Sequence, residues 1–261
     1  MLHRSFAVMV PNSGLCVGLD VDLDRIPEHL RDRADAVEAF NAAVIDATRH
    51  VAACYKVNLA FYEKLGRRGI DALYATREMI GDAYVIMDAK RGDIGNTSAA
   101  YASAVFDDLR ADAITVAPYM GRDSVEPFLA VPGRMTYVLA LTSNPGSHDF
   151  QRLDVGGQPL FMHVMQTVQS WPRKGDVGFV VGATHANELA TLRSAFPDVP
   201  FLIPGIGTQG GDAAATVHAN GGGPAVYNVS RGLLYGSNTE DFAVHVRAEA
   251  ERLAALMGVA G

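Results

Sequence analysis

Eight short apolar runs are spread along the chain, and each is followed by a polar or glycine-rich turn. They occupy residues 15–20, 53–59, 84–90, 113–119, 136–142, 177–183, 201–206 and 225–230. The runs are continuously hydrophobic, which is typical of parallel strands covered on both faces and not of a half-exposed sheet with alternating residues. The pattern therefore predicts eight buried parallel strands.

Segments with helical periodicity lie between these runs. Residues 34–50 place apolar side chains three and four residues apart, which gives the helix one apolar stripe. Helices are also expected at 61–66, 70–80, 97–110, 122–130, 160–170, 186–195, 211–219 and 240–257. Eight strand–helix units in 261 residues match the size of a (β/α)8, or TIM, barrel. A doubly wound open sheet is the alternative, although it seldom needs eight such evenly spaced units. Since no linker or shift in composition divides the chain, we expect residues 1–261 to form a single α/β barrel domain.

Charge and composition narrow the classes of function. The chain has 22 Lys and Arg against 29 Asp and Glu, and this net charge of −7 gives no support for a nucleic-acid partner, which usually meets a basic face. No stretch approaches the roughly 20 apolar residues of a membrane span, and the early run AVMV is too short for a secretory signal. We therefore expect no membrane partner and a cytoplasmic location. Cys16 and Cys54 lie in apolar runs and should be buried core residues.

The longest irregular segment is SNPGSHDFQRLDVGGQP, residues 143–159. A loop of this length in a compact domain is usually functional or mobile. Because it follows the fifth predicted strand, it belongs on the face where the carboxyl ends of barrel strands form active sites.

Ionic residues stand at the ends of three otherwise apolar strands. Asp20 ends the first, Lys56 interrupts the second, and Asp88 and Lys90 end the third, with Asp93 three residues further on. Strand side chains alternate between faces, so Asp88 and Lys90 should share one side, which in a barrel could be the interior. Buried charges without partners would cost several kcal/mol each, so these lysines and aspartates should pair.

These residues allow two interpretations. Each could be a solvated strand end that forms a surface salt bridge. We favour a catalytic site with a lysine as the proton donor, because the ionic residues converge from three successive strands.

The glycine-rich segment PGIGTQGGD, residues 204–212, predicts a phosphate site. Its glycines let backbone N–H groups approach an anion, and the helix that follows would present its positive N-terminus. Arg231, just after the eighth strand, can add a charge-assisted contact. Phosphate sites after strands seven and eight recur in barrels. A tight turn without a ligand is the alternative.

Several of these segments together resemble one enzyme family. They are DAKRGDIGNTSAAYA (88–102), GLD (18–20), YKVN (55–58), LTSNPG (141–146), PGIGTQGGD (204–212) and VSRG (229–232). The first carries a D-x-K-x-x-D pattern and closely resembles the signature of the orotidine 5′-phosphate decarboxylase family. The chain is similar to bacterial members with slightly longer chains.

The resemblance implies decarboxylation of orotidine 5′-monophosphate to uridine 5′-monophosphate (UMP) and CO2, the last step of UMP synthesis, without a cofactor or metal. It makes Lys90, Asp88, Asp93 and Lys56 the catalytic residues. Lys90 would protonate C6, and Asp88 would disfavour the bound ground state by repelling the substrate carboxylate. Asp20 and Lys56 would hold ribose hydroxyls.

The remaining ligand contacts are also implied by the resemblance. Ser143 would contact the pyrimidine and Pro204 would border it. Gln209, Ser230 (through its backbone) and Arg231 would hold the phosphate. Asp93 and Thr97 would reach the site of a second copy, in a homodimer with shared active sites.

Two rival functions remain open. Related sugar-phosphate decarboxylases and hexulose-phosphate synthases share the barrel and the D-x-K-x-x-D pattern, but they use Mg²⁺ with an acidic residue where this chain has Lys56. A noncatalytic phosphosugar sensor is the second. It would need the phosphate site but not the lysine–aspartate array.

Overall fold

A closed barrel of parallel strands forms the centre of the protein. The computed structural model describes residues 14–183, 186–206 and 212–258. Within them the barrel strands are β1 (Leu15–Gly18), β2 (Cys54–Asn58), β3 (Tyr84–Arg91), β4 (Ala113–Val116), β5 (Met135–Leu141), β8 (Asp176–Val181), β9 (Phe201–Pro204) and β10 (Ala225–Val229). Each strand pairs in parallel with its neighbours along the chain, and β10 closes the barrel on β1. The predicted (β/α)8 barrel is confirmed.

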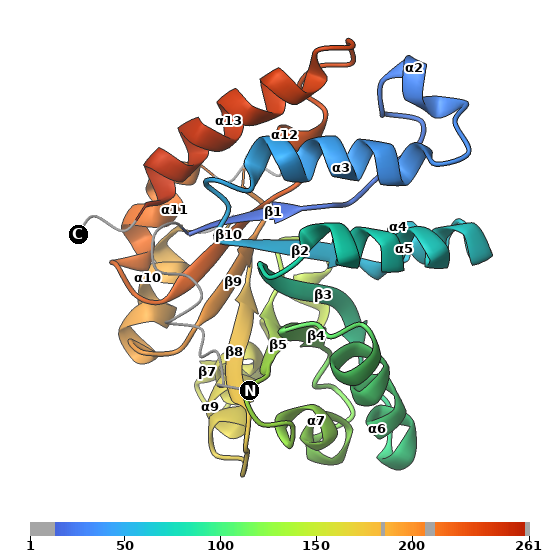
Figure 1. Ribbon diagram of the computed structural model, residues 1–261. Coiled ribbons are helices and arrows are strands. Elements are labelled where there is room, and N and C mark those ends of the chain that lie inside the picture. The colour runs from blue at the N-terminus through green and yellow to red at the C-terminus, as the bar shows by residue number, and fades with distance from the viewer. Residues whose placement is uncertain (1–13, 184–185, 207–211, 259–261) are drawn as a thin grey trace.

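Helices surround the strands on the outside (Figure 1). They are α2 (Glu28–Arg31), α3 (Ala36–Thr48), α4 (Leu59–Glu63), α5 (Gly66–Ile80), α6 (Gly95–Ser103), α7 (Arg122–Leu129), α8 (Ser147–Phe150), α9 (Leu160–Gln169), α10 (Ala186–Ala195), α11 (Ala213–Asn220), α12 (Arg231–Leu234) and α13 (Phe242–Met257). The helix predicted at 97–110 consists of α6 and a π-helical turn, η1 (Ala104–Asp108). None of the described helices is long and apolar enough to cross a membrane.

The segment 143–159 is more ordered than its composition suggested. It contains α8 and a small antiparallel hairpin of β6 (Asp154–Val155) and β7 (Gln158–Pro159). Gly156 and Gly157, both at positive φ, form the turn. The expectation of an irregular loop was therefore wrong, because paired glycines allow a tight turn that brings two short strands together.

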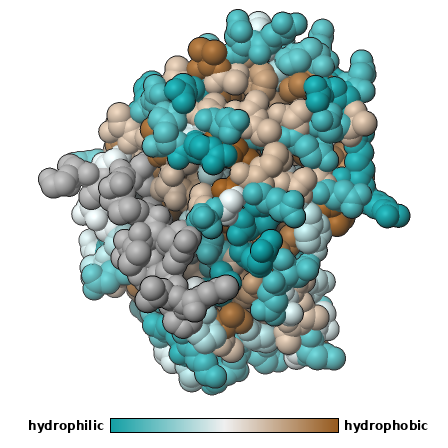
Figure 2. All heavy atoms as spheres, viewed as in Figure 1, coloured by the Kyte–Doolittle hydropathy of each residue, from teal (hydrophilic) through white to brown (hydrophobic). Residues whose placement is uncertain are grey.

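Two hydrophobic clusters hold the barrel together. The smaller one consists of side chains from the barrel strands and includes Cys16, Cys54, Tyr84 and Tyr137. Both cysteines are free and buried, as predicted. The larger cluster combines residues of the strands with residues of the surrounding helices. Hydrophilic residues cover much of the face in Figure 2, with hydrophobic ones scattered between them.

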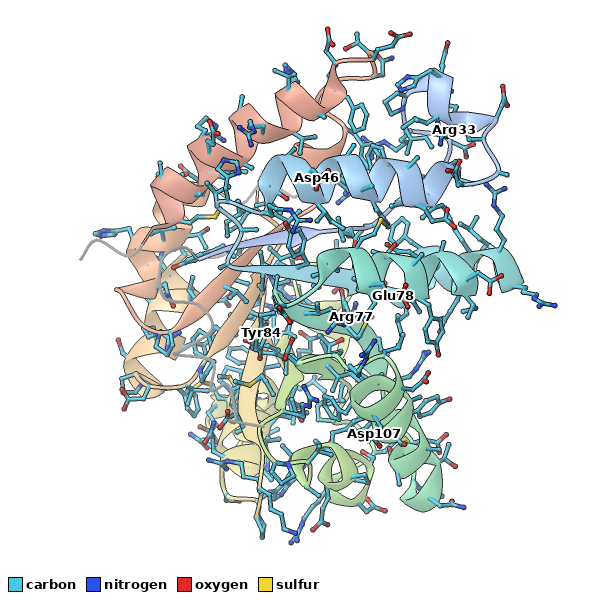
Figure 3. All side chains as sticks on the ribbon, in the orientation of Figure 1. Arg33, Asp46, Arg77, Glu78, Tyr84 and Asp107 are labelled. Atoms are coloured by element: carbon cyan, nitrogen blue, oxygen red, sulfur yellow. The ribbon has the colours of Figure 1, made fainter. Side chains whose placement is uncertain are left out.

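Polar contacts fix the outer helices to the loops between strands. Arg77 of α5, labelled in Figure 3, donates to the carbonyl oxygens of Leu109 and Arg110 just before β4. Side chains from both layers fill the space between helices and strands in the same view. The strands are thus held from outside, which leaves their carboxyl ends free to carry polar groups.

Candidate active site

A cavity of about 320 Å³ opens at the carboxyl ends of the barrel strands. It is lined by Asp20, Lys56, Asn58, Asp88, Lys90, Thr115, Leu139, Thr142, Ser143, Asn144, Val180, Leu202, Pro204, Gly205, Ile206, Asn228, Ser230 and Arg231. Most of the site residues predicted from the sequence are in this set. This is the face on which barrel enzymes carry their active sites.

An ionic chain runs along one side of the cavity. The Nζ atom of Lys56 lies 3.6 Å from Oδ1 of Asp20 and 2.9 Å from Oδ2 of Asp88. The other oxygen of Asp88, Oδ1, lies 2.6 Å from Nζ of Lys90. The predicted pairing of these lysines and aspartates is therefore observed.

Burial and charge act against each other in this chain. Burial alone would raise the pKa of Asp88, but Lys56 and Lys90 outweigh it and hold the pKa well below its ordinary value. Burial alone would lower the pKa of Lys56, but Asp20 and Asp88 raise it above its usual range. Asp88 and Lys56 are therefore both charged at neutral pH. The Lys56 side chain is only 4% exposed and the Lys90 side chain 50%, so Lys90 faces the open part of the site.

A backbone irregularity directs Lys90 toward Asp88. Met87 pairs with Ile114 of β4, and the next paired residues are Arg91 and Val116. Asp88, Ala89 and Lys90 thus lie opposite the single residue Thr115, and Lys90 has a φ of 47°. The predicted contact between Asp88 and Lys90 is present. However, it arises from this bulge and not from the regular alternation of a strand.

Two tyrosines hold the backbone at Asp20. The hydroxyl of Tyr62 donates to the carbonyl of Leu19, and the hydroxyl of Tyr235 donates to the carbonyl of Asp20. The Ser230 hydroxyl donates to Oδ2 of Asp20. Ser230 can approach Asp20 this closely only because residue 18 is glycine, since a Cβ at Gly18 would lie 2.2 Å from the Ser230 hydroxyl oxygen.

The segment after β5 brings Ser143 to the cavity. Next to it, the Thr142 amide donates to Oε1 of Gln151 at 2.8 Å, and the Gln151 amide donates to the Thr142 hydroxyl. Arg152 then forms a two-point ion pair with Glu188 of α10. These contacts tie the C-terminal end of α8 to the end of β5, next to Ser143, and to α10.

Two of the predicted phosphate-binding residues, Ser230 and Arg231, line the same cavity, and Ser230 contacts Asp20 directly. Arg231 begins the short helix α12 and Ser230 directly precedes it, while Pro204, which was predicted to border the pyrimidine, ends β9. Arg231 is exposed and forms no ion pair with another described residue. Gln209 lies outside the residues that the structure describes.

The helix that follows the glycine-rich segment bears on the phosphate prediction. The helix after the glycine-rich segment, α11, was expected to present its positive N-terminus to the anion. Oδ1 of Asp212 accepts hydrogen bonds from the amides of Ala214 and Ala215. An acidic side chain therefore caps this helix and occupies two of its N-terminal amides.

Asp93 and Thr97 do not line the cavity of their own chain. The Asp93 carboxylate accepts a hydrogen bond from the Ile94 amide at 2.7 Å, and Thr97 is exposed on the first turn of α6. Both stand on the rim beyond β3.

Sequence reasoning missed several polar residues of the site: Asn58, Thr115, Thr142, Asn144 and Asn228. The signal available for Thr115 and Asn228 was a polar residue inside an apolar run, AITV and AVYNV. That signal is weak, because Thr136 is another such residue and lies outside the site.

Among the described residues, no cluster of three or more His, Cys, Asp and Glu side chains is placed to hold a metal ion. The charged groups of the cavity are instead arranged as alternating lysines and carboxylates. Such pairs shift the pKa values of their members, and shifted pKa values are typical of catalytic sites. Because the pairs lie on the face where barrels carry their active sites, the protein is a (β/α)8-barrel enzyme.

The particular enzyme family follows from comparison with known proteins. The model of the family described as "Orotidine 5′-phosphate decarboxylase / HUMPS family" matches residues 13–243. The chain belongs to this family. A relative from Porphyromonas gingivalis named orotidine 5′-phosphate decarboxylase is 45% identical over 255 residues, which cover 95% of this chain and 92% of that protein.

Solved structures agree with this assignment. The OMP decarboxylase of Leishmania donovani is 37% identical and superposes with a TM-score of 0.82, covering 97% of each chain. The UMP synthase of the same organism is 38% identical with a TM-score of 0.85, but the match covers only 56% of that longer protein against 97% of this one.

Proposed function

We propose that this protein decarboxylates orotidine 5′-monophosphate to UMP and CO2, the last step of UMP synthesis, with Lys90 as the proton donor. The observation that carries the proposal is the chain Lys56–Asp88–Lys90, which ends in a half-exposed ammonium group at the cavity. Relatives that carry the name orotidine 5′-phosphate decarboxylase match nearly the whole chain and support the reaction.

The reaction breaks the bond between C6 and the carboxyl carbon, and the electron pair stays on C6. That carbanion lies in the plane of the ring, where resonance does not delocalise it. The Lys90 ammonium stabilises the charge and then transfers a proton to C6. Asp88 remains ionised beside it and, by repelling the substrate carboxylate, disfavours the ground state.

Residues at the carboxyl ends of the other strands hold the rest of the nucleotide. Asp20 and Lys56 bind ribose hydroxyls, and Ser143 and Pro204 contact the pyrimidine. Gln209, the Ser230 backbone and Arg231 bind the phosphate. The support for Arg231 is its exposed guanidinium at the cavity, with no carboxylate of the described chain paired to it. Binding energy from this remote phosphate can orient the reacting groups.

A metal-dependent activity on sugar phosphates is the main rival. It places a divalent cation at the end of the second strand, where this chain has the buried ammonium group of Lys56. That group already forms ion pairs with Asp20 and Asp88, and it would repel a cation directly. The charge of Lys56 therefore favours the reaction that needs no metal.

We further propose that the active unit is a homodimer in which Asp93 and Thr97 complete the site of the partner copy. An apolar rim follows the carboxyl ends of β3, β4 and β5. Its side chains are between 49% and 87% exposed, and they are Ile94, Tyr119, Met120, Phe150 and Leu153. An exposed apolar patch of this kind is typical of an interface. In a twofold dimer, each copy would donate the same residues that it receives.

The test is turnover of orotidine 5′-monophosphate by the purified protein, followed as loss of absorbance, before and after dialysis against a chelator. We expect the same rate in both. Activity that disappears and returns with Mg²⁺, together with a preference for sugar phosphates, would establish the metal-dependent rival. Binding of the nucleotide without turnover would establish the sensor.

A further inference from the structure

Thr115 occupies the one place in the site where the backbone of Lys90 and the carboxylate of Asp88 come together. It belongs to β4, is 1% exposed, and lines the cavity. Its Oγ1 atom lies 2.9 Å from Oδ1 of Asp88 and 3.0 Å from the backbone nitrogen of Lys90. One hydroxyl therefore contacts both residues.

The direction of these two hydrogen bonds is determined by chemistry. Lys56 and Lys90 keep Asp88 ionised, so its carboxylate has no proton to donate. The single proton of the Thr115 hydroxyl must point to Asp88, which leaves an oxygen lone pair for the N–H of Lys90. The bond to the carboxylate is charge-assisted and hence among the stronger kinds.

The backbone of Lys90 needs such a partner. The β3–β4 ladder is interrupted between Met87 and Arg91, and it resumes where the Ala117 amide donates to the Arg91 carbonyl. In the gap, the Lys90 N–H has a side-chain acceptor in place of a strand carbonyl. Lys90 also has a φ of 47°, a conformation that a residue with a Cβ adopts only when its surroundings impose it.

We propose that Thr115 is a positioning residue for the decarboxylation: it holds the bulge at Lys90 and the carboxylate of Asp88 in one rigid unit and so aims the Lys90 ammonium at the substrate. The inference rests on the proposed function. Lys90 is held at both ends, because its amide binds Thr115 and its ammonium binds the carboxylate that Thr115 orients. Neither contact involves the phosphate end of the cavity.

Thr136 provides a matched control in the neighbouring strand. It is also a fully buried threonine in a barrel strand, on β5, but no described residue forms a hydrogen bond with its hydroxyl. Thr115→Val and Thr136→Val make the same change in size and polarity. Only the first removes hydrogen bonds from Lys90 and Asp88.

The experiment compares Thr115→Val, Thr115→Ser and Thr136→Val with the wild type on orotidine 5′-monophosphate. Titration with UMP counts the binding-competent sites, so that kcat refers to folded protein. We expect Thr115→Val to lower kcat by about 10–100-fold while KM changes by less than about 3-fold, since losing a hydrogen bond to a charged group has effects of this size. Thr115→Ser keeps the hydroxyl and should retain most of the rate, although it loses a buried methyl group. Thr136→Val should resemble the wild type.

A packing role for Thr115 predicts the reverse order. The serine variant, which leaves a small cavity, would then be the more impaired, and the valine variant would keep its kcat. Either that order or equal kcat losses in Thr115→Val and Thr136→Val would overturn the inference.

A second readout separates this inference from the proposed function. If the wild type does not turn over orotidine 5′-monophosphate, the proposed function fails, and with it the role of Thr115 in that reaction. The structural part is tested by amide hydrogen exchange at Lys90. We expect exchange at least about 10-fold faster in Thr115→Val than in the wild type and in Thr136→Val, because the N–H loses its acceptor. Equal exchange would overturn the hydrogen bond itself.

Discussion

At the scale of single residues, Lys56 and Lys90 have different environments although both bind Asp88. Lys56 is enclosed between two carboxylates, whereas half of the Lys90 side chain is accessible from the cavity. An enclosed ammonium group fixes the charge of its neighbours, and an accessible one can reach a substrate. This difference supports the proposal that Lys90 transfers the proton and that Lys56 supports the array.

Lys90→Ala should abolish decarboxylation and leave the barrel folded. Loss of a proton donor alone lowers rates by about 10²–10⁴-fold, and the lost electrostatic stabilisation of the carbanion adds to this. Single-turnover rates and UMP binding measure the two properties separately. Lys174→Ala removes an exposed lysine just before β8, at the other end of the barrel, and should have no effect. Near-wild-type turnover in a folded Lys90→Ala protein would rule out the assignment.

Asp88→Asn should reveal how the ionic chain contributes to stability. Burial opposes ionisation of Asp88, but the two lysines hold its folded-state pKa below the ordinary value of about 3.9. As the pH falls, the Asp88 carboxylate is therefore protonated at a higher pH in the unfolded chain than in the folded protein. The contribution of Asp88 is complete above that ordinary value and is lost as the pH decreases toward the folded-state pKa.

We accordingly expect the wild type to exceed Asp88→Asn in free energy of unfolding by a constant amount from about pH 5 to 7, and by less at pH values below about 4. Urea unfolding at several pH values measures this difference. Asp71→Asn, which changes an exposed carboxylate on α5, serves as the comparison. A difference that does not change down to pH 3 would contradict the pairing.

At the scale of elements, different groups of strand ends supply different parts of the cavity. β1, β2 and β3 carry the ionic chain, β5 leads to Ser143, and β9 and β10 lead to Pro204 and Arg231. The short helix α12 acts at two sites, because Arg231 begins it and Tyr235, directly after it, donates to the carbonyl of Asp20. The proposed phosphate end and the ionic end of the cavity are thereby joined through one turn of helix.

Arg231→Ala should weaken the use of phosphorylated substrate specifically. Loss of a charge-assisted contact costs about 1.5–3 kcal/mol, which is about 10–150-fold in kcat/KM. Orotidine without its phosphate should react poorly with the wild type and be little affected by the substitution. If the substitution impairs both substrates equally, Arg231 does not bind the phosphate.

At the scale of the whole molecule, the proposed dimer explains two features of the rim. Asp93 and Thr97 lie outside their own cavity. Exposed apolar side chains follow the same ends of the strands, including Tyr119, which is 87% exposed and contacts the ring of Phe150. A partner copy would cover these side chains and bring Asp93 to a second site.

Mixing inactive Lys90→Ala chains with inactive Asp93→Ala chains tests this arrangement. If the sites are shared, a mixed dimer has one site without both groups and one site with both intact. Random exchange makes half of the dimers mixed, so about a quarter of all sites should regain activity. Subunit exchange is verified with differently tagged chains. Failure to recover activity after verified exchange would show that Lys90 and Asp93 do not meet across an interface.

The sequence alone predicted the eight barrel strands and the ionic residues at their ends. Continuous apolar runs mark strands that are buried on both faces, so Asp20, Lys56 and Asp88 stood out as charges that need partners. The barrel order then followed from the even spacing of strands and helices, which is a local property of the chain.

The tertiary structure decided what depends on contacts between distant segments. The bulge that aims Lys90 requires the register of β3 against β4, and no pattern within either strand specifies it. The hairpin in 143–159 and the Asp212 cap on α11 are, by contrast, local contacts: paired glycines allow the hairpin turn, and Asp is a common N-cap residue. Thr115 shows the difference most clearly. In the sequence it is one polar residue in an apolar strand, like Thr136, and only the pairing of strands places its hydroxyl between Asp88 and Lys90.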